Sequence, residues 1–125
     1  MLGRYRIVRG KRPEGDPLPE GTRQDTRKHT SHVLRPDADK VQAYLRAPGE
    51  AAWRAFTREY RRTLDKRWRT ERDRFEEIAE LARSTDLWLG CSCPTTKNPD
   101  VRHCHTFLAL QYLEKKYPDL RIVWP

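Results

Sequence analysis

The C-terminal third of the chain alternates between short apolar segments and one helical segment, and this alternation constrains the fold more than any other feature. Residues 87–91, LWLGC, form an apolar run of strand length. A loop follows it, then a helical pattern over 103–117 and a second apolar run over 120–124. Strands joined through a helix lie parallel in one sheet, with a right-handed connection. The sequence therefore predicts an α/β fold with a small, mostly parallel sheet.

The clearest periodic signal lies between residues 50 and 68. Five large apolar side chains recur there at intervals of three and four: Trp53, Phe56, Tyr60, Leu64 and Trp68. This stripe predicts an amphipathic helix that buries one face in the core. A shorter helix is expected between Asp37, a good N-cap, and Pro48. Thr70 and Asp73 resemble a capping box, which would begin a third helix.

The length of 125 residues is typical of one domain. Hydrophobic residues make up 36% and charged residues 35%, so the core must be small and must rely on the four Trp, five Tyr and three Phe. We expect a single three-layer α/β domain over 1–125, with its sheet flanked by helices. Residues 10–36 are basic and rich in proline and glycine, which predicts a loop segment with one short strand near 32–34.

Composition also bears on the compartment and the partners of the chain. No run of about 18 apolar residues occurs, and residues 1–13 contain no apolar stretch of signal-peptide length. Three cysteines cannot all pair within the chain, so we expect thiols, metal ligands or catalytic groups in a cytoplasmic protein without membrane contact. The net charge of +8 is concentrated in the first third of the chain. Such a basic segment attracts phosphate groups, either of nucleic acid or of a small anion.

All three cysteines and two of the four histidines lie in or beside one loop. Cys91 ends the predicted strand and Cys93 follows it, while Cys104 lies between His103 and His105 where the next helix starts. In open α/β sheets, ligands bind where loops leave the carboxyl ends of the strands. We therefore expect the functional site within residues 87–117, the unit of strand, cysteine loop and helix.

Three interpretations of this unit remain open. In a reactive-thiol site, Cys104 would be the nucleophile at a helix N-terminus, with His105 as its partner and Cys91 as a second thiol. In a metal site, Cys91, Cys93, Cys104 and His105 would form a donor set of the Cys₃His type, which zinc accepts, and iron is the other metal considered. In a structural role, the thiols would be small buried apolar groups.

Basic side chains supply candidate ligands for a small anionic molecule: Arg23, Arg27 and His32 from the segment 10–36, and Arg102 from the cysteine loop. Their joint action requires that the segment 10–36 packs near Cys104. A nucleic-acid-binding module is the alternative, built on the 23–35 cluster and on Arg4, Arg6, Arg9, Lys11 and Arg12, although the chain has no nucleic-acid recognition motif. The pattern does not distinguish an enzyme from a binding protein.

Three segments of the chain have a familiar order: GTRQDTRKHTSHVLRP, then the W-x₂-F-x₃-Y-x₃-L helix, then LGCSCPTTKNPDVRHCH with its apolar helix. Over about residues 4–117 this order resembles the bacterial family called domain of unknown function 488. The resemblance implies an α/β fold and a site at Cys104-His105, but no reaction, because the activity of the family is not established. Relatives commonly have arginine after the Cys-His pair, where this chain has Thr106. The resemblance therefore implies that an anion-binding role of that arginine falls here to Arg102 or Arg23.

Overall fold

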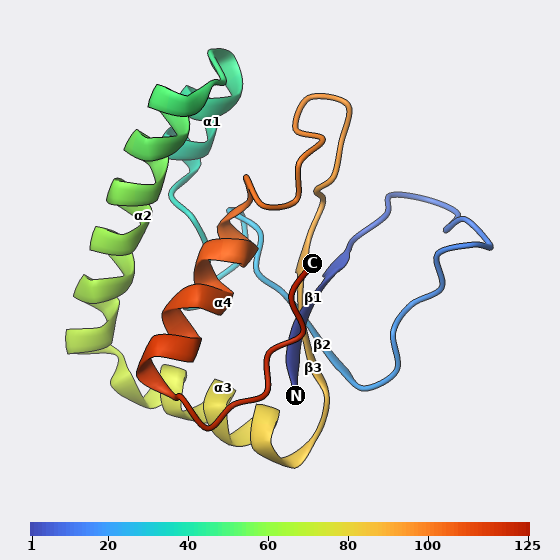
Figure 1. Ribbon diagram of the computed structural model, residues 1–125, viewed down its shortest axis with the longest axis vertical. Helices are drawn as coiled ribbons and strands as arrows, with labels where there is room; N and C mark the ends of the chain where they lie inside the picture. The colour runs from blue at the N-terminus through green and yellow to red at the C-terminus, as the bar shows by residue number, and fades with distance from the viewer.

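The computed structural model describes residues 1–125 and contains one open parallel sheet with four helices (Figure 1). The strands are β1 (Leu2–Arg6), β2 (Thr22–Asp25) and β3 (Leu87–Cys91). The helices are α1 (Ala38–Arg46), α2 (Glu50–Thr70), α3 (Arg72–Ser84) and α4 (His105–Lys116). This arrangement confirms the predicted α/β class and the parallel sheet. None of the helices is long and apolar enough to cross a membrane.

The central strand is β3, in the order β1-β3-β2, and it runs parallel to both neighbours. At its carboxyl end Cys91 lies beside Arg6 of β1, and Gly90 lies beside Asp25 of β2. The loops that leave the three strands therefore begin next to one another, at one edge of the sheet. This edge is where open α/β folds bind their ligands, and here it receives both the cysteine loop and the basic segment.

The helices gather on one face of the sheet (Figure 1), which differs from the expected three layers with helices flanking the sheet on both faces. Helix α4 packs directly on β1 and β3, and α2 packs against the outer side of α4 and also contacts α1 and α3. Leu89 of β3, Leu110 of α4 and Leu64 of α2 are fully buried and belong to one core cluster of 19 residues. One continuous apolar core therefore joins the sheet, α4 and α2.

The opposite face of the sheet is covered by the loop between β1 and β2. Trp88 of β3 lies on this face, and its indole Nε1 donates a hydrogen bond to the backbone oxygen of Glu20 in that loop (2.8 Å). The Trp88 ring lies directly over Gly3 of β1, where a Cβ would come within 2.7 Å of the ring. The glycine thus allows the ring to lie flat across the neighbouring strand.

Two predicted strands differ from the structure. The segment 10–36 contains β2 rather than a strand near 32–34, where a turn is closed by the N–H of Arg35 donating to the oxygen of His32 (3.1 Å). The segment 120–124 forms only one parallel bridge, between Ile122 and Leu2. Val33 and Leu34 are buried in the first segment, and Leu120 is buried in the second, but too few backbone groups pair in either place to make a strand.

Two helix starts also differ from the prediction. Thr70 does not cap α3 in a capping box with Asp73, because α2 continues through Thr70, whose hydroxyl donates to the oxygen of Lys66 (3.1 Å). Helix α4 starts at His105, two residues later than expected, because Cys104 has an extended backbone (φ −134°, ψ 147°). Cys104 is therefore the N-cap residue of α4.

Gly21, immediately before β2, provides a test of the fold. Its φ of +117° is a conformation that residues with a side chain rarely adopt, and a Cβ there would collide with the backbone oxygen of Asp86. We expect Gly21→Ala to lower the free energy of unfolding by about 1–3 kcal/mol or more, measured by urea denaturation. Gly15→Ala is the control, because a Cβ at Gly15 meets open space. Equal stabilities of the two variants would contradict this prediction.

Candidate functional site

A cavity of about 280 Å³ lies between the carboxyl edge of the sheet and the first two helices. The segment after β2 contributes Arg27, Lys28 and His29 to its wall, and the helices α1 and α2 contribute Tyr44, Trp53 and Phe56. The cysteine loop and the start of α4 contribute Cys91, Ser92, Cys93, Asn98, His103, Cys104 and His105. The basic segment 10–36 thus packs against the cysteine loop, as the joint-site hypothesis requires. We call this hollow the thiol cavity.

The three cysteines come together in the wall of the thiol cavity. Their Sγ atoms all lie within 4.8 Å of one another. Cys91 and Cys93 are two residues apart, a spacing that places side chains on the same side of an extended segment, and Cys104 comes from the far end of the loop. The buried Asn98 joins the two ends, since its Nδ2 donates to the sulfur of Cys93 (3.3 Å) and to the backbone oxygen of His103 (2.7 Å).

Cys104 is the thiol whose surroundings most favour the thiolate form. Hydrogen bonds from the thiols of Cys91 and Cys93 lower the pKa of Cys104 well below its ordinary value, and the Thr106 hydroxyl (3.2 Å) and amide act in the same direction. The same interaction with Cys104 raises the pKa of Cys91 and Cys93, which keep their protons. The partial positive charge at the N-terminus of α4 also stabilises a thiolate there.

His105 is buried and faces two polar neighbours. Its Nε2 lies 2.8 Å from the hydroxyl oxygen of Thr26, and its Nδ1 lies 3.8 Å from the Cys104 sulfur. Because the Thr26 hydroxyl donates to the backbone oxygen of Gly90 (2.9 Å), it must accept from the Nε2–H of His105. The Nδ1 atom is then an unprotonated acceptor beside Cys104. Burial lowers the pKa of His105 to about 4, so the ring is neutral near pH 7.

The predicted set of four metal ligands is only partly brought together. The side chains whose ligand atoms all lie within 4.8 Å of one another are the three cysteines, and His105 is not in this group, although its Nδ1 lies 3.8 Å from the Cys104 sulfur. Three sulfurs thus form the metal-compatible cluster, and a fourth ligand would have to come from elsewhere.

Of the four basic side chains predicted to bind an anion, Arg27 is the one that lines the thiol cavity. Two hydrogen bonds from its guanidinium to Asp25 fix its position, Nε to Oδ1 at 3.0 Å and Nη2 to Oδ2 at 2.8 Å. Arg23 instead donates to the backbone oxygen of Pro19 (2.8 Å), and Arg102 is exposed and donates to Asp100 (3.4 Å). The structure therefore separates Arg23 and Arg102 from the thiols.

His32, the fourth of these side chains, lies in the turn before α1. Its Nε2 is 2.6 Å from the Oε1 of Gln24, and its Nδ1 accepts from the N–H of Leu34 (3.1 Å). It does not line the thiol cavity. Its two hydrogen bonds and its partial burial indicate that His32 stabilises the turn rather than binds a ligand.

The buried ring of His32 leads to a pH-dependence prediction. Burial lowers its pKa from 6.5 to about 4, so between these pH values the unfolded chain binds more protons than the folded chain. The free energy of unfolding should therefore fall as the pH falls through this window, by about 1–3 kcal/mol from this group. Urea denaturation at several pH values should show a weaker fall for His32→Gln than for the wild type. His29→Gln should keep the wild-type slope, since that side chain is 62% exposed; a wild-type slope in His32→Gln would refute the assignment.

Arg4 of β1 and Thr106 of α4 complete the site and were not among the predicted catalytic or anion-binding residues. The Nε of Arg4 donates to the Thr106 hydroxyl (3.0 Å), and its Nη2 donates to the backbone oxygen of Cys93 (2.6 Å). A guanidinium thus lies beside the thiol cluster and ties β1 to both ends of the cysteine loop. No local pattern indicates this role of Arg4, because its contact with α4 depends on the tertiary fold.

Taken together, the open parallel sheet and the three cysteines at its carboxyl edge define an α/β protein with a cluster of thiols. The sequence profile of the active DUF488-N3 subclade matches residues 5–117. The chain therefore belongs to the domain of unknown function 488 family, which confirms the resemblance of its motifs. No curated protein matches the chain, and no solved structure matches it. The position after the Cys-His pair, where the resemblance implies an arginine in relatives, is Thr106 in this chain. Thr106 accepts a hydrogen bond from Arg4, so a guanidinium lies beside this position.

Proposed function

We propose that the thiol cavity binds a small anionic molecule and that Cys104 acts on it as a thiolate nucleophile. The observation that carries this proposal is the meeting of three thiols at the N-terminus of α4 inside one cavity. Thiolates form where hydrogen-bond donors and partial positive charge surround the sulfur, and Thr106 and the helix terminus supply both. The description of the matching subclade as active is in keeping with chemistry at this site.

Each neighbour of Cys104 has a role in this proposal. The Cys104 proton is lost to solvent, because the hydrogen bonds from Cys91, Cys93 and Thr106 stabilise the thiolate. His105 stays neutral and keeps its Nδ1 3.8 Å from the sulfur, in the tautomer that Thr26 imposes, so it positions the thiolate. The Cys104 sulfur then donates the electron pair of the new bond to the ligand. The bond between the ligand and its leaving group breaks, and that group departs with its electron pair. Arg27 attracts the anionic part of the ligand, and Cys91 is the second thiol beside the nucleophile.

A second candidate function is the binding of a transition metal, zinc in the first place. One observation favours it, namely that three sulfur atoms lie within 4.8 Å of one another. Three cysteines and one further ligand form a tetrahedral set that zinc accepts, and cysteine also binds iron in clusters. Since His105 does not belong to the group of ligand atoms within 4.8 Å of one another, the fourth position would be left for a group that enters the cavity.

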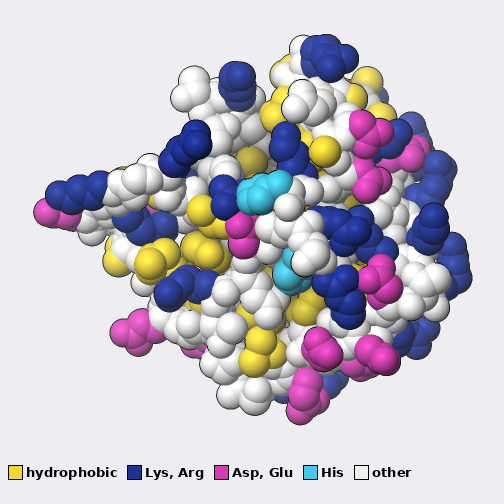
Figure 2. All heavy atoms as spheres, turned by 180° about the vertical axis from the view of Figure 1, so that it is seen from behind, with side chains coloured by type: hydrophobic (Ala, Val, Ile, Leu, Met, Phe, Trp, Pro, Cys, Tyr) yellow, Lys and Arg dark blue, Asp and Glu magenta, His cyan; other side chains and the backbone are white.

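A nucleic-acid-binding module has weaker support. On the face shown in Figure 2, Lys and Arg side chains alternate with Asp and Glu side chains instead of forming one basic stripe. Several of the basic side chains proposed for this role are engaged within the fold, such as Arg12 by Asp16 (3.2 Å) and Arg4 by the Thr106 hydroxyl (3.0 Å). A small anion in a cavity fits this distribution better than a long polyanion does.

One experiment separates the candidates: the metal content and the thiol reactivity of the purified native protein, measured together. We expect no stoichiometric metal, and one thiol that reacts with iodoacetamide at neutral pH much faster than the other two. Peptide mass spectrometry should place the label on Cys104. About one equivalent of zinc or iron, with thiols protected until a chelator is added, would overturn the nucleophile in favour of the metal site. No metal and three slow thiols would overturn both functions.

A further inference from the structure

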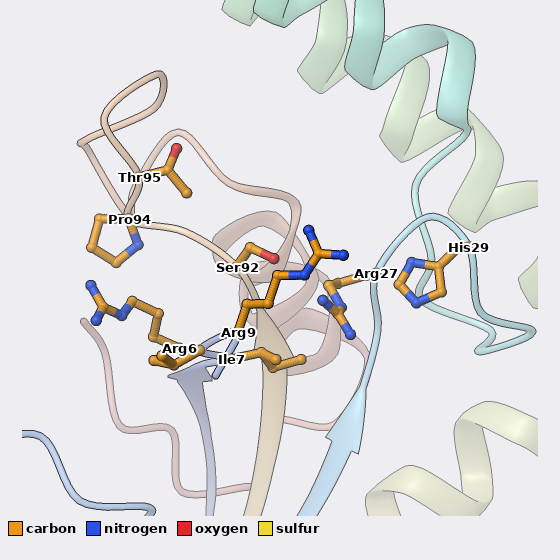
Figure 3. Close-up of a pocket in the computed structure, with 9 residues that line it drawn as sticks. Arg6, Ile7, Arg9, Arg27, His29, Ser92, Pro94 and Thr95 are labelled. Carbon is orange, nitrogen blue, oxygen red and sulfur yellow. The ribbon is translucent and has the colours of Figure 1, made fainter. Parts of the chain in front are cut away.

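A wider cleft of about 770 Å³ lies next to the thiol cavity, at the carboxyl ends of β1 and β3 (Figure 3). Three arginines from different segments line it, namely Arg6 at the end of β1, Arg9 in the loop that follows, and Arg27 after β2. The cleft shares four wall residues with the thiol cavity: Arg27, His29, Ser92 and Thr95. A molecule bound in the cleft would therefore adjoin the cysteine cluster. We call this hollow the arginine cleft.

The positive charge of the arginine cleft is only partly neutralised. Arg9 takes part in no ion pair, and the Nε of Arg6 is buried without a hydrogen-bond partner. The acid closest to Arg6 is Asp16, at 3.9 Å, and Asp16 is bound more closely by Arg12, at 3.2 Å. An unpaired buried N–H raises the free energy of the folded protein. An anionic oxygen in the cleft would supply the missing acceptor.

Guanidinium groups in such an arrangement suit phosphate better than other anions. Each presents a planar fork of N–H donors that matches two phosphate oxygens. Figure 3 shows Arg9 and Arg27 on one side of Ser92 and Arg6 on the other. Asp25 engages the Nε and Nη2 of Arg27, but the remaining donors of Arg27 together with those of Arg6 and Arg9 are still more than a single carboxylate can accept. A ligand group with several phosphate oxygens can accept hydrogen bonds from more of these N–H donors.

The thiol cavity next to this cleft has a different character, because one wall of it is aromatic. Trp53 is stacked on Phe56 with ring centroids 5.4 Å apart, and Tyr44 meets Trp53 edge-on at 5.5 Å. Apolar walls of this kind bind flat, ring-containing groups. The two adjoining hollows therefore offer one site for phosphate oxygens and one for an organic ring.

We propose that the ligand is a phosphorylated small molecule with a ring-containing body. Its phosphate groups bind Arg6, Arg9 and Arg27 in the arginine cleft, and its ring enters the thiol cavity beside Cys104. This inference rests on the proposed function, because it takes the thiol cavity as the ligand site. It adds the substrate class and assigns the cleft as the phosphate subsite. A nucleoside diphosphate has this chemistry.

Calorimetric titration of the native protein with ADP, pyrophosphate and adenosine tests the inference. ADP should bind more tightly than either of the other two probes, and it should slow the alkylation of Cys104. Arg9→Gln should weaken the binding of ADP and pyrophosphate by about tenfold or more, the range expected for a charge-assisted contact, and should leave adenosine unaffected. Trp53→Leu should weaken ADP and adenosine but not pyrophosphate. Lys11→Gln is the matched control, because this exposed basic side chain lies near Arg9 in sequence but does not line the cleft.

The outcomes distinguish this inference from the proposed function. A fast-reacting Cys104 without measurable binding of ADP or pyrophosphate would overturn the phosphate subsite and leave the nucleophile in place. Binding of ADP that Arg9→Gln does not weaken would overturn it as well. Binding of pyrophosphate that depends on Arg9, together with an inert Cys104, would support the subsite and overturn the nucleophile. A single-stranded oligonucleotide that binds far more tightly than ADP, with strong salt dependence, would replace the small ligand by nucleic acid.

Discussion

Cys104→Ser should lose the fast reaction with iodoacetamide, with a fall in rate of about 100-fold or more, because the thiolate is the reacting species. The two thiols that remain should not replace it. In this variant the hydrogen bond with the Cys104 thiol is lost, but burial still raises the pKa of Cys91 and Cys93, so both stay mostly protonated near neutral pH. In the wild type, the rate should rise with pH and level off at a midpoint below that of an ordinary thiol, because the pKa of Cys104 is lowered.

Cys93→Ser is the matched variant for this prediction, since it alters the same cluster and keeps Cys104. It removes one of the thiols that donate to the Cys104 sulfur. The midpoint of the pH–rate profile should move upward, while the fast reaction is retained. Circular dichroism of both variants checks that the chain is folded. If Cys93→Ser abolishes the fast reaction and Cys104→Ser does not, Cys104 is not the nucleophile.

The parts of the fold that follow from local patterns could be predicted from the sequence. The apolar stripe of the long helix reflects a helix that is buried on one face. The continuous apolar run of β3 is typical of a strand that is buried on both faces. β2 has the sequence TRQD, which is polar, and its pairing partner β3 lies more than sixty residues further on. A strand is expected near Val33, where Val33 and Leu34 are apolar. Both are indeed buried, but in a turn.

For the site, the meeting of the three cysteines could be expected because all three lie in or beside the one loop that joins β3 to α4. The choice among the basic side chains could not be made, since it depends on the position of β2. Once β2 is known to end at Asp25, Arg27 lies in the loop at that edge, whereas Arg23 lies within the strand. Thr26 and Asn98 were missed because each acts through two side-chain hydrogen bonds, which no local pattern encodes.

A large effect on the free energy of unfolding is expected for substitution of Arg67, a buried arginine in α2. It adjoins the apolar stripe, and its Nη1 donates to the backbone oxygens of Val33 (2.8 Å) and Arg35 (2.6 Å). The Tyr60 hydroxyl donates to the oxygen of Leu34 (2.6 Å) in the same turn. Helix α2 thus satisfies three successive backbone oxygens of the segment between β2 and α1. These groups have few other partners, because the turn lies against the helix rather than in the sheet.

Arg67→Leu should therefore lower the free energy of unfolding by about 3 kcal/mol, since two backbone oxygens lose a charged donor and the one at Val33 is buried. Urea denaturation at neutral pH measures the change. Arg69→Leu is the control, as its exposed side chain lies on the same helix two residues further on. Because the segment that Arg67 holds leads to Pro36 in the wall of the thiol cavity, Arg67→Leu should also make Cys104 more accessible to bulky thiol reagents. A loss of stability no larger than that of Arg69→Leu would show that the turn does not depend on this arginine.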